Sequence, residues 1–567
     1  MTFLPSVARE LRVASRRAAT YWTRFTGALL AIVVASLAWA LLLGHSPRET
    51  GLTLFITLSV IAYVYSLLAG TFTTADCVSE EKREGTLGLL FLTDLRSYDI
   101  VLGKLAASSV SGVYGLLAIF PIMGIPLLLG GVAPAEFWRV VLVCVNNLFL
   151  SLALGMICST VCKDERRAIG LTVIIVLMLT AGWPAFITWL PFTLDASGAW
   201  RDFFGQHLFS LYSPSPGFAC VFAFDATYQE MLKQTKFNWF YVSLAFNHAL
   251  GWLALMFTTL LLPLVWQDRA ATPHSVRRRE RWRLWTDGTK EVRAAFRRQL
   301  LEVNPFYWLA SRDRFKVMLV WLWLGAGAAL WMFGLTKERH SWLDNTVYVW
   351  TALFAHSSLK CWLAMEASRR LGEDRRSGAL ELLLSTPLSV PDILRGQWLA
   401  LLRQFGAAAA LVVAVDFLFL SLGLKHTFED RASWTVMWLA GAGIFIFDLV
   451  TLTLLAMWGS LSGRKSNQAG LSAIVRVCVL PWFLLGVVVA SLAIMEEVFR
   501  FRPFGTNVPD YWIILLWFVI SLATDALLAG WALRRLRADF RTVATQRIES
   551  KAAIWGRWLG NMFTTKK

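Results

Sequence analysis

Two clusters of charged residues in this 567-residue chain repeat each other at a fixed distance. The first lies just before Gly85, and the second, 293 residues later, lies just before Gly378. Their members are Glu80, Glu81, Arg83 and Glu84 in the first copy and Glu373, Asp374 and Arg376 in the second. Acidic and basic side chains placed together can form ion pairs with a partner protein. The pattern contains no metal-ligand spacing, so it predicts a docking surface.

The repeat extends beyond the charges. Between Glu80–Lys104 and Glu373–Gln397, 11 of 25 positions are identical without a gap. Each copy follows the second long apolar segment of its half of the chain. The protein is therefore predicted to consist of two fused copies of one unit.

A leucine-rich segment follows each glycine and ends at Thr93 or at Thr386-Pro387. At helical spacing, the apolar residues share one face. In the first copy the segment contains Thr86, Leu87, Leu90 and Phe91, and in the second it contains Leu380, Leu383 and Leu384. We expect a short helix along the inner membrane surface with its charged start exposed.

The elements that position these clusters are membrane helices. The chain is 56% hydrophobic and has 28 Trp, which leaves too little polar surface for a soluble protein of this length. Twelve stretches are long and apolar enough to span a bilayer, six in each half. They are 25–44, 51–74, 105–131, 137–161, 168–191, 237–266, 317–335, 346–365, 398–422, 434–461, 470–495 and 511–533. The predicted fold class is an all-α polytopic membrane protein.

Basic residues predict the orientation, because Lys and Arg are retained on the cytoplasmic side. Most of the 55 Lys and Arg fall in cytoplasmic segments if both termini are cytoplasmic. Six spans per half make the two halves parallel repeats related by an axis along the membrane normal. The location predicted from this pattern is a bacterial inner membrane.

The predicted organisation has five parts. Residues 1–24 form an amphipathic elbow helix, 25–266 the first six-helix half, and 267–289 a basic cytoplasmic linker. Residues 290–533 form a second elbow, with a break at Pro305, followed by the second half, and 534–567 form a basic tail. The outer segment 192–236 is much longer than its counterpart near 496–510.

The net charge of +17 raises the question of nucleic acid. Many of the basic residues lie beside membrane ends, where each is worth about 1 kcal/mol of attraction to anionic lipid. Arg277, Arg279 and Arg283 of the linker have no recognisable fold to present them to a nucleic acid. We therefore predict anionic lipid as a partner and no nucleic acid.

The repeated motif resembles that of the ABC-2 type permease family, including permeases associated with multicopper-enzyme maturation. The shared features are a Glu-rich turn, Gly-Thr-Leu, a Leu pair, Thr-Pro and a later Gly-Lys. They correspond here to Glu80, Glu84, Gly85-Thr86-Leu87, Leu89-Leu90, Thr93 and Gly103-Lys104, and in the second copy to Glu373, Gly378, Leu380, Leu382-Leu383, Thr386-Pro387 and Gly396. Asp94, Ser377, Ala379 and Gln397 depart from the pattern.

The resemblance implies that this motif couples the membrane domain to a separate ATPase subunit. The partner would be an ABC ATPase dimer that binds ATP and Mg, and the chain itself would bind no cofactor and transport an unidentified substrate. Consistently, the sequence has no Gly-x-x-x-x-Gly-Lys-Ser/Thr phosphate loop. The chain is thus predicted to be an exporter permease and not an enzyme.

Polar residues within the spans are a second group of candidates, because charges in a bilayer are costly and often functional. Asn147 and Asp448 lie at about equivalent depths of their spans. Arg476 and Asp525 lie at similar depths near the inner side, and we expect them to form an ion pair. Lys360 is expected to extend to the inner interface.

Two further polar features complete the predictions. We expect Asp416 to be solvated at the outer interface, whereas Asn146, Asn147, Asn247 and His248 could bond between helices. Two other functions remain open: an ion-coupled secondary transporter using Asp448 and Asp525, and a membrane scaffold that holds an ATPase for signalling or enzyme maturation. The substrate class also stays open, because lipid, drug and glycan exporters all have apolar walls.

Overall fold

The computed structural model describes residues 46–92, 95–193, 207–235, 237–265, 288–311, 315–337, 342–426, 431–463, 466–499 and 511–546, with isolated residues at 27–35 and 277–284. The chain divides into two compact units, Met1–Ala270 and Ala271–Lys567, which we describe separately. The predicted elbow at 1–24, most of the 25–44 span, most of the linker and the tail after 546 lie outside the described residues.

Ten helices in the described ranges are long and apolar enough to cross a membrane, which confirms the predicted all-α polytopic fold. Of the two remaining predicted spans, 25–44 lies mainly outside the described residues. The stretch 346–365 does form a helix. Its mean hydropathy is too low for it to be one of the ten, because it contains polar residues such as His356 and Lys360.

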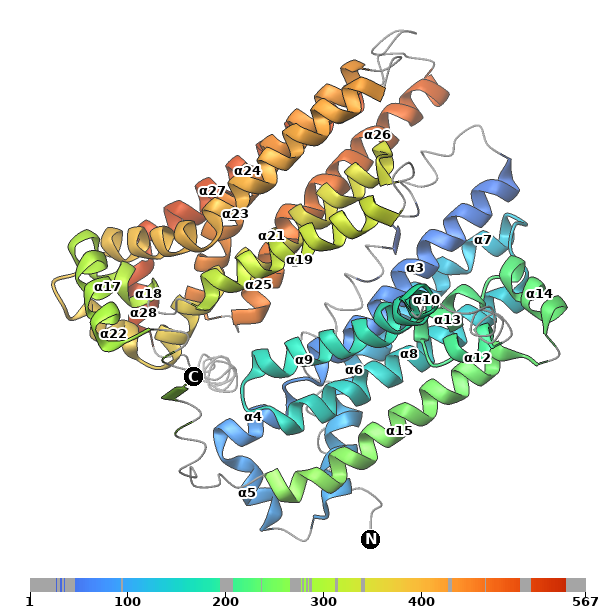
Figure 1. The fold of residues 1–567 in the computed structure, drawn as a ribbon, viewed down its shortest axis with the longest axis horizontal. Helices are drawn as coiled ribbons and strands as arrows, with labels where there is room; N and C mark the ends of the chain where they lie inside the picture. The colour runs from blue at the N-terminus through green and yellow to red at the C-terminus, as the bar shows by residue number, and fades with distance from the viewer. Residues whose placement is uncertain are drawn as a thin grey trace, which may run out of the picture. The chain divides into compact units, whose positions relative to one another are not determined.

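The first unit has five described membrane helices and several short ones (Figure 1). The long helices are α3 (Pro47–Thr73), α6 (Ser97–Met123), α8 (Pro134–Val161), α9 (Glu165–Leu177) with its continuation α10 (Trp183–Thr193), and α15 (Trp239–Val265). The short ones are α4 (Cys77–Glu84), α5 (Thr86–Phe91), α7 (Ile125–Leu128), α12 (Leu208–Tyr212), α13 (Pro216–Val221) and α14 (Asp225–Gln234).

The second unit begins with two elbow helices and then has six long helices. The elbow consists of α17 (Lys290–Val303) and α18 (Pro305–Ser311). The long helices are α19 (Phe315–Lys337), α21 (Asn345–Arg376), α23 (Val390–His426), α24 (Arg431–Leu461), α25 (Ser466–Ile474) with its continuation α26 (Leu480–Phe499), and α27 (Tyr511–Ala538). The short helices are α22 (Ala379–Leu384) and α28 (Phe540–Thr545).

One helix is the centre of each unit. In the first unit, α8 packs against α3, α6, α9 and α15, and 72% of its most apolar stretch is buried. In the second unit, α24 packs in the same way against α21, α23, α25 and α27, and 56% is buried. The same element therefore forms the core of both copies.

The fifth span of each unit is interrupted at a similar place by a π-helical turn. These turns are η1 (Met178–Gly182) between α9 and α10, and η2 (Val475–Val479) between α25 and α26. A π-turn adds a residue to the helix and is common at functional positions. Its presence in both units extends the structural repeat beyond the charged motif.

The outer segment of the first unit packs onto its central helix. Arg139 of α8 is 8% exposed, and its side chain bonds to the Ala223 carbonyl at 2.9 Å and to Asp225 Oδ1 at 2.8 Å. Its guanidinium also lies 4.2 Å from the ring centre of Tyr228. Glu136 Oε1 accepts a 3.1 Å hydrogen bond from the Asp225 backbone at the start of α14. The segment is thereby fixed to the N-terminal end of α8.

The elbow of the second unit breaks at Pro305, as predicted. The α17 helix ends at Val303, and Asn304 Oδ1 accepts hydrogen bonds from the backbone of Phe306 and Tyr307 at the start of α18. Asn304 Nδ2 donates to the Asp392 carbonyl of α23 at 2.9 Å. The Asn side chain thus caps the new helix and attaches it to the third span.

Candidate coupling site and intramembrane charges

The repeated motif has the same backbone conformation in both units. Gly85 and Gly378 both have φ of 73°, in the left-handed region that side chains rarely adopt. Each glycine ends one helix and begins a six-residue helix, α5 in the first unit and α22 in the second. The motif therefore forms a sharp turn between a charged helix end and a short leucine-rich helix.

The two short helices bury and expose equivalent leucines. Leu87 and Leu380 are 3% and 0% exposed and belong to the cores of their units. Leu90, Leu383 and their neighbours pack partly against the same cores. Leu89 and Leu382, in contrast, are 63% and 72% exposed. Leu92 of the first copy is also exposed, at 83%. Each copy therefore presents at least one leucine to its surroundings, and each also has an exposed acidic residue, Glu84 or Glu373.

A basic residue ties each motif to the end of the central helix. Lys82 Nζ donates to the Thr160 carbonyl in the last turn of α8, and Arg375 Nη1 donates to the Leu461 carbonyl, the last residue of α24. Cations are stabilised at helix C-termini, where carbonyls lack partners. Arg375 also donates to the Gln546 carbonyl at 3.2 Å, and partial burial lowers its pKa.

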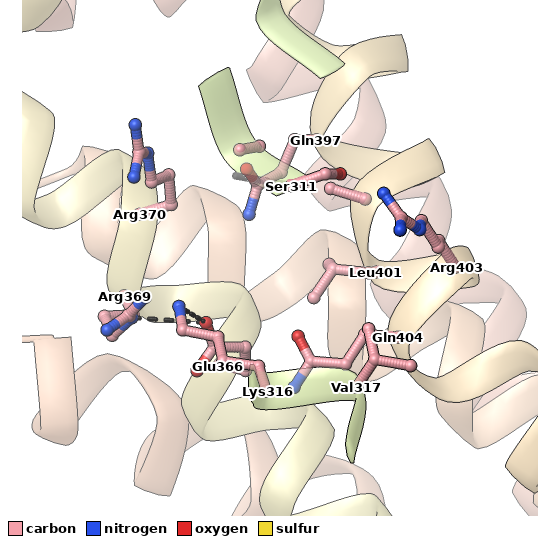
Figure 2. Close-up of a pocket in the computed structure, with 12 residues that line it drawn as sticks. Ser311, Lys316, Val317, Glu366, Arg369, Arg370, Gln397, Leu401, Arg403 and Gln404 are labelled. Carbon is pink, nitrogen blue, oxygen red and sulfur yellow. Dashed lines mark hydrogen bonds and ion pairs between the residues drawn. The ribbon is translucent and has the colours of Figure 1, made fainter. Parts of the chain in front are cut away.

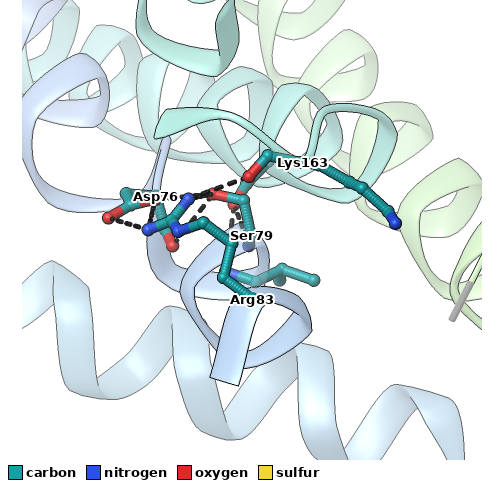
Figure 3. Close-up of polar contacts among 6 residues, drawn as sticks. Asp76, Ser79, Arg83 and Lys163 are labelled. Atoms are coloured by element: carbon teal, nitrogen blue, oxygen red, sulfur yellow. Dashed lines mark hydrogen bonds and ion pairs between the residues drawn. The ribbon is translucent and has the colours of Figure 1, made fainter. Parts of the chain in front are cut away.

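The first unit holds its motif with an additional polar network (Figure 3). Arg83 Nη2 lies 2.7 Å from Asp76 Oδ1 and 3.0 Å from Oδ2, while Arg83 Nη1 donates to the Lys163 carbonyl at 2.9 Å. Ser79 Oγ donates to Asp76 Oδ1 at 2.6 Å. The network connects α4 to the loop after α8, and the backbone N–H groups of Val78 and Ser79 also donate to Ser159 Oγ of α8 at 2.9 and 3.0 Å, so several contacts hold α4 against α8.

A further ion pair joins the motif to the third span. Lys104 Nζ of α6 lies 2.6 Å from Glu81 Oε1, and Thr86 Oγ1 donates to Glu81 Oε2. The later Gly-Lys of the motif thus bonds to its Glu-rich start. In the second unit Gln397 occupies the position of Lys104, and Asp374, which corresponds to Glu81, pairs instead with Arg370 at 3.2 Å.

The remaining motif residues are placed as follows. Glu80 is half-buried, whereas Arg376, Thr386 and Pro387 are exposed at the surface of the second unit. Thr93 lies outside the described residues.

Replacing Arg83 with glutamine is expected to loosen α4 without unfolding the unit. The change removes the paired contact with Asp76 and the bond to the Lys163 carbonyl, worth about 1.5–3 kcal/mol when the acceptor is charged and less at this partly exposed site. Hydrogen–deuterium exchange in peptides covering 76–91 should rise several-fold. Arg167→Gln, which removes an exposed ion pair of α9, is the matched control. Unchanged exchange in 76–91 would show that the network does not hold α4.

The charged residues within the second unit form a buried cluster that differs from the prediction. Lys360 Nζ lies 2.5 Å from Asp448 Oδ2, and their side chains are 14% and 5% exposed. Asp525 lies beside Asp448 and Thr451 and is 2% exposed. The expectation that Lys360 extends to the interface is therefore wrong.

The predicted ion pair between Arg476 and Asp525 is also wrong. Both carboxylate oxygens of Asp525 are buried without a hydrogen-bond partner among the described residues. Arg476 lies in the π-turn η2. The prediction rested on the similar depth of the two residues in their helices. Asp525 instead faces the central helix α24, where it lies beside Asp448.

A second buried pair involves His356, one helical turn before Lys360 in α21. His356 Nε2 lies 2.8 Å from Asp416 Oδ2 of α23, and Asp416 is 2% exposed, which contradicts the prediction that it is solvated. The His356 ring stacks on Phe445 at 4.2 Å, and Lys360 Nζ lies 5.8 Å from the same ring centre. The His356–Asp416 and Lys360–Asp448 pairs therefore both adjoin one aromatic ring, that of Phe445.

The first unit has neutral polar groups at comparable places. His248 Nδ1 lies 3.1 Å from Asn146 Oδ1, and Asn146 Nδ2 donates to the Leu244 carbonyl at 3.1 Å. The prediction of interhelical bonding is therefore confirmed for Asn146 and His248, but no interhelical bond of Asn147 or Asn247 is found among the described residues. Asn247 bonds to Ser243 in its own helix. Asn147 is 1% exposed, and its amide nitrogen has no partner among the described residues. The two units thus share a fold but not their intramembrane charge.

A cavity of about 530 Å³ adjoins the charged cluster. It lies between α21, α24, α26 and α27, and its lining is mainly apolar and aromatic, including Trp438, Trp482 and Trp517. Its polar lining includes His356, Ser357, Lys360, Asp448 and Ser521. In the described part of the chain, no group of three or more His, Cys, Asp or Glu residues is arranged to hold a metal ion.

Several of these residues could not be selected from the sequence. Asp76 and Ser79 precede the repeated segment that begins at Glu80. The residues 293 positions later, Arg369 and Gly372, are of other types. Lys82 and Arg375 do share a charge at equivalent positions, and this repeated charge was the available signal for the tether.

Comparison with known proteins bears on the first unit. The family model for ABC-2 family transporter protein matches residues 46–266, which run from the start of α3 to the end of α15. No curated protein matches the chain significantly. The resemblance inferred from the repeated motif is confirmed over this range. Residues 46–266 therefore match an ABC-2 family transporter domain, and the chain is an integral membrane protein.

Proposed function

We propose that this chain is the membrane subunit of an ATP-driven exporter and that a separate ATPase, acting as a dimer, binds to residues 80–104 and 373–397. The observation that carries the proposal is the equivalence of the two motifs. Each has a left-handed glycine, a buried and an exposed leucine, and a basic residue bonded to the end of the central helix. A surface repeated at this level of detail suits a partner with two equivalent subunits.

The same geometry supports a route for coupling. Lys82 and Arg375 connect each motif to the most buried helix of its unit, so a displacement of the motif acts directly on that helix. Exposed Leu89 and Leu382 offer apolar contact to the partner, and the charges around them offer complementary ion pairs. In this proposal both termini are cytoplasmic, the membrane is a bacterial inner membrane, and ATP and Mg bind to the partner.

A double charge reversal tests the docking surface. We expect Glu80→Lys with Glu373→Lys to release the ATPase that co-purifies with the unmodified chain from native membranes in mild detergent. Reversal places like charges against the basic groups that complement these carboxylates, and such contacts cost several kcal/mol. Quantitative mass spectrometry of the purified complex should show at least a tenfold loss of the ATPase.

The control for this experiment is Glu302→Lys, which reverses an exposed charge on the elbow helix α17 outside both motifs. It should retain the ATPase. Leu89→Glu with Leu382→Glu should release it as the charge reversal does. If the folded unmodified chain brings down no ATPase, or if the double reversal retains it, the docking proposal fails.

A gradient-driven transporter is the second candidate, because Lys360, Asp448 and Asp525 are buried together next to the 530 Å³ cavity. Intramembrane carboxylates are common in proton relays. Under this alternative, liposomes containing only the chain take up protons, as measured with an entrapped pH dye, and Asp525→Asn stops the uptake. Proton-tight liposomes would remove this candidate.

A further inference from the structure

A small polar cavity lies at the cytoplasmic end of the second unit, where four helices meet (Figure 2). Ser311 ends α18 and Lys316 begins α19, while the other polar residues come from the end of α21 and the start of α23. The cavity has a volume of about 20 Å³, enough for one water molecule or one oxygen of a ligand. Its polar lining consists of Ser311, Lys316, Glu366, Arg369, Arg370, Gln397, Arg403 and Gln404.

The charge of this lining is strongly positive. It contains four cationic side chains and one carboxylate, Glu366, whose Oε1 lies 2.8 Å from Lys316 Nζ and 3.2 Å from Arg369 Nε. Asp374, just outside the lining, lies 3.2 Å from Arg370 Nε. With both carboxylates counted, the described residues still leave an excess of two positive charges at the cavity. Such an excess attracts an anion.

Several polar atoms of the lining are buried without a hydrogen-bond partner among the residues that the structure describes. They are Ser311 Oγ, Gln404 Nε2, Arg403 Nη1 and Gln397 Oε1. Gln397 and Gln404 are only 2% and 9% exposed. A buried polar group without a partner costs about 1–3 kcal/mol, so several in one place indicate a ligand that supplies the missing partners. The hydroxyl, guanidinium and Gln404 amide groups donate hydrogen bonds, and the amide of Gln397 donates when it is rotated.

This arrangement belongs to the second unit and not to the shared fold. At the repeat distance of 293 residues, Gln397 replaces Lys104, Arg369 replaces Asp76 and Arg370 replaces Cys77. In the first unit, Lys104 is paired with Glu81, and Asp76 is paired with Arg83. The second unit has therefore exchanged an internally satisfied set of ion pairs for a basic cavity with unused donors.

We propose that this cavity binds an oxygen of a phosphate group. Guanidinium and amide donors suit phosphate oxygens, and the cavity admits one such oxygen while the rest of the group stays at its mouth. Phe296 of α17 lies 4.4 Å from the Arg403 guanidinium and holds it at the site. The phosphate is supplied either by an inner-leaflet phospholipid headgroup or by a soluble phosphate compound, and both use the same donors.

The test uses the full chain, purified in detergent and freed of phospholipid. Its unfolding temperature is measured during titration with short-chain phosphatidylglycerol, with short-chain diacylglycerol that lacks phosphate, and with inorganic phosphate. We expect saturable stabilisation by phosphatidylglycerol and none by diacylglycerol if the source is a lipid. Saturable stabilisation by inorganic phosphate at comparable concentration would instead identify a soluble source.

Gln404→Leu is the decisive variant. It retains most of the side-chain volume but removes a buried donor that has no partner in the empty cavity. The unliganded variant should therefore unfold at the same or a higher temperature, whereas its apparent Kd for the phosphate probe should rise at least tenfold. A residue with only a structural role would show the opposite, a lower unfolding temperature and unchanged binding.

Two further variants control for charge and folding. Arg395→Gln removes an exposed positive charge from α23 outside the cavity and should leave the Kd unchanged. Arg403→Lys keeps the charge but loses the planar fork, and should weaken binding severalfold. If neither phosphatidylglycerol nor inorganic phosphate stabilises the chain, or if Arg395→Gln weakens binding as much as Gln404→Leu, the cavity holds water only and the proposal is overturned.

Discussion

Lys360→Met is expected to destabilise the second unit by about 3–5 kcal/mol, the usual cost of removing one partner from a buried ion pair. Lys360 Nζ lies 2.5 Å from Asp448 Oδ2, and Asp525 is buried beside Asp448. Removing the ammonium leaves two neighbouring carboxylates in an apolar helix bundle. The unfolding temperature of the chain in detergent, followed by the exposure of the partly buried Cys478, should fall clearly.

A second substitution distinguishes lost charge balance from lost packing. Lys360→Met combined with Asp448→Asn removes one charge of each sign and should recover most of the stability lost in the single variant. Lys233→Met, on the exposed face of α14 in the first unit, should leave the unfolding temperature unchanged. An unfolding temperature of Lys360→Met equal to that of the unmodified chain would mean that the ion pair contributes nothing to the bundle.

Gly70→Ala is expected to have a comparably large effect in the first unit, because α3 and α8 approach too closely for a side chain. A Cβ added at Gly70 would lie 1.9 Å from the Ser151 carbonyl oxygen, and one added at Gly155 would lie 2.7 Å from the Gly70 carbonyl oxygen. Both are contacts with backbone, which a rotamer change cannot relieve. Overpacking usually costs about 1–3 kcal/mol, and we expect at least the upper value here.

The close approach also carries hydrogen bonds that the substitution would break. The Gly70 amide donates to Ser151 Oγ at 3.2 Å, and Thr74 Oγ1 donates to the Leu152 carbonyl at 2.9 Å. Small residues at such a crossing are typical of membrane helices. The control is Gly170→Ala in α9, where an added Cβ would meet nothing within 4 Å. Equal yield and unfolding temperature for Gly70→Ala and Gly170→Ala would refute the steric argument.

The motif itself was largely predictable from the sequence, because the chain contains two copies. The pairing of Gly85 with Gly378 identified positions that share φ of 73°, and the leucine pattern identified the buried residues Leu87 and Leu380. Comparing the two copies shows which residue types occur at the same position in both. Asp76 was missed because the corresponding residue in the second copy is Arg369, so nothing in the repeat marks it.

The intramembrane charges were predicted poorly for a physical reason. Hydropathy gives the depth of a residue in its helix, but pairing depends on which face points to which neighbour. Arg476 and Asp525 share a depth, yet Asp525 faces α24 and lies beside Asp448. Asp416 was assigned to the outer interface from depth alone, whereas His356 of α21 covers it. The partner of each charge comes from a helix that is distant in sequence.

The cavity in Figure 2 illustrates the same limit at the end of the second unit where α18 and α19 meet α21 and α23. Its donors come from α18, α19, α21 and α23, and each of them has an ordinary explanation as a basic or polar residue near a membrane end. Their shared role in the proposed phosphate site becomes visible only because the fold brings them together around one small cavity.

The central helix of the first unit is held at both ends. Near its C-terminal end the Thr160 carbonyl is bonded to Lys82, and near its N-terminal end Arg139 is bonded to Asp225 of α14. Its 28 residues span about 42 Å, and, unlike α6 and α15, it has no proline beyond its first turn to bend it. Such a helix is expected to move as a rigid unit. We expect a displacement of Lys82 at one end of this helix to reach Asp225 at the other end with little change of conformation within the helix.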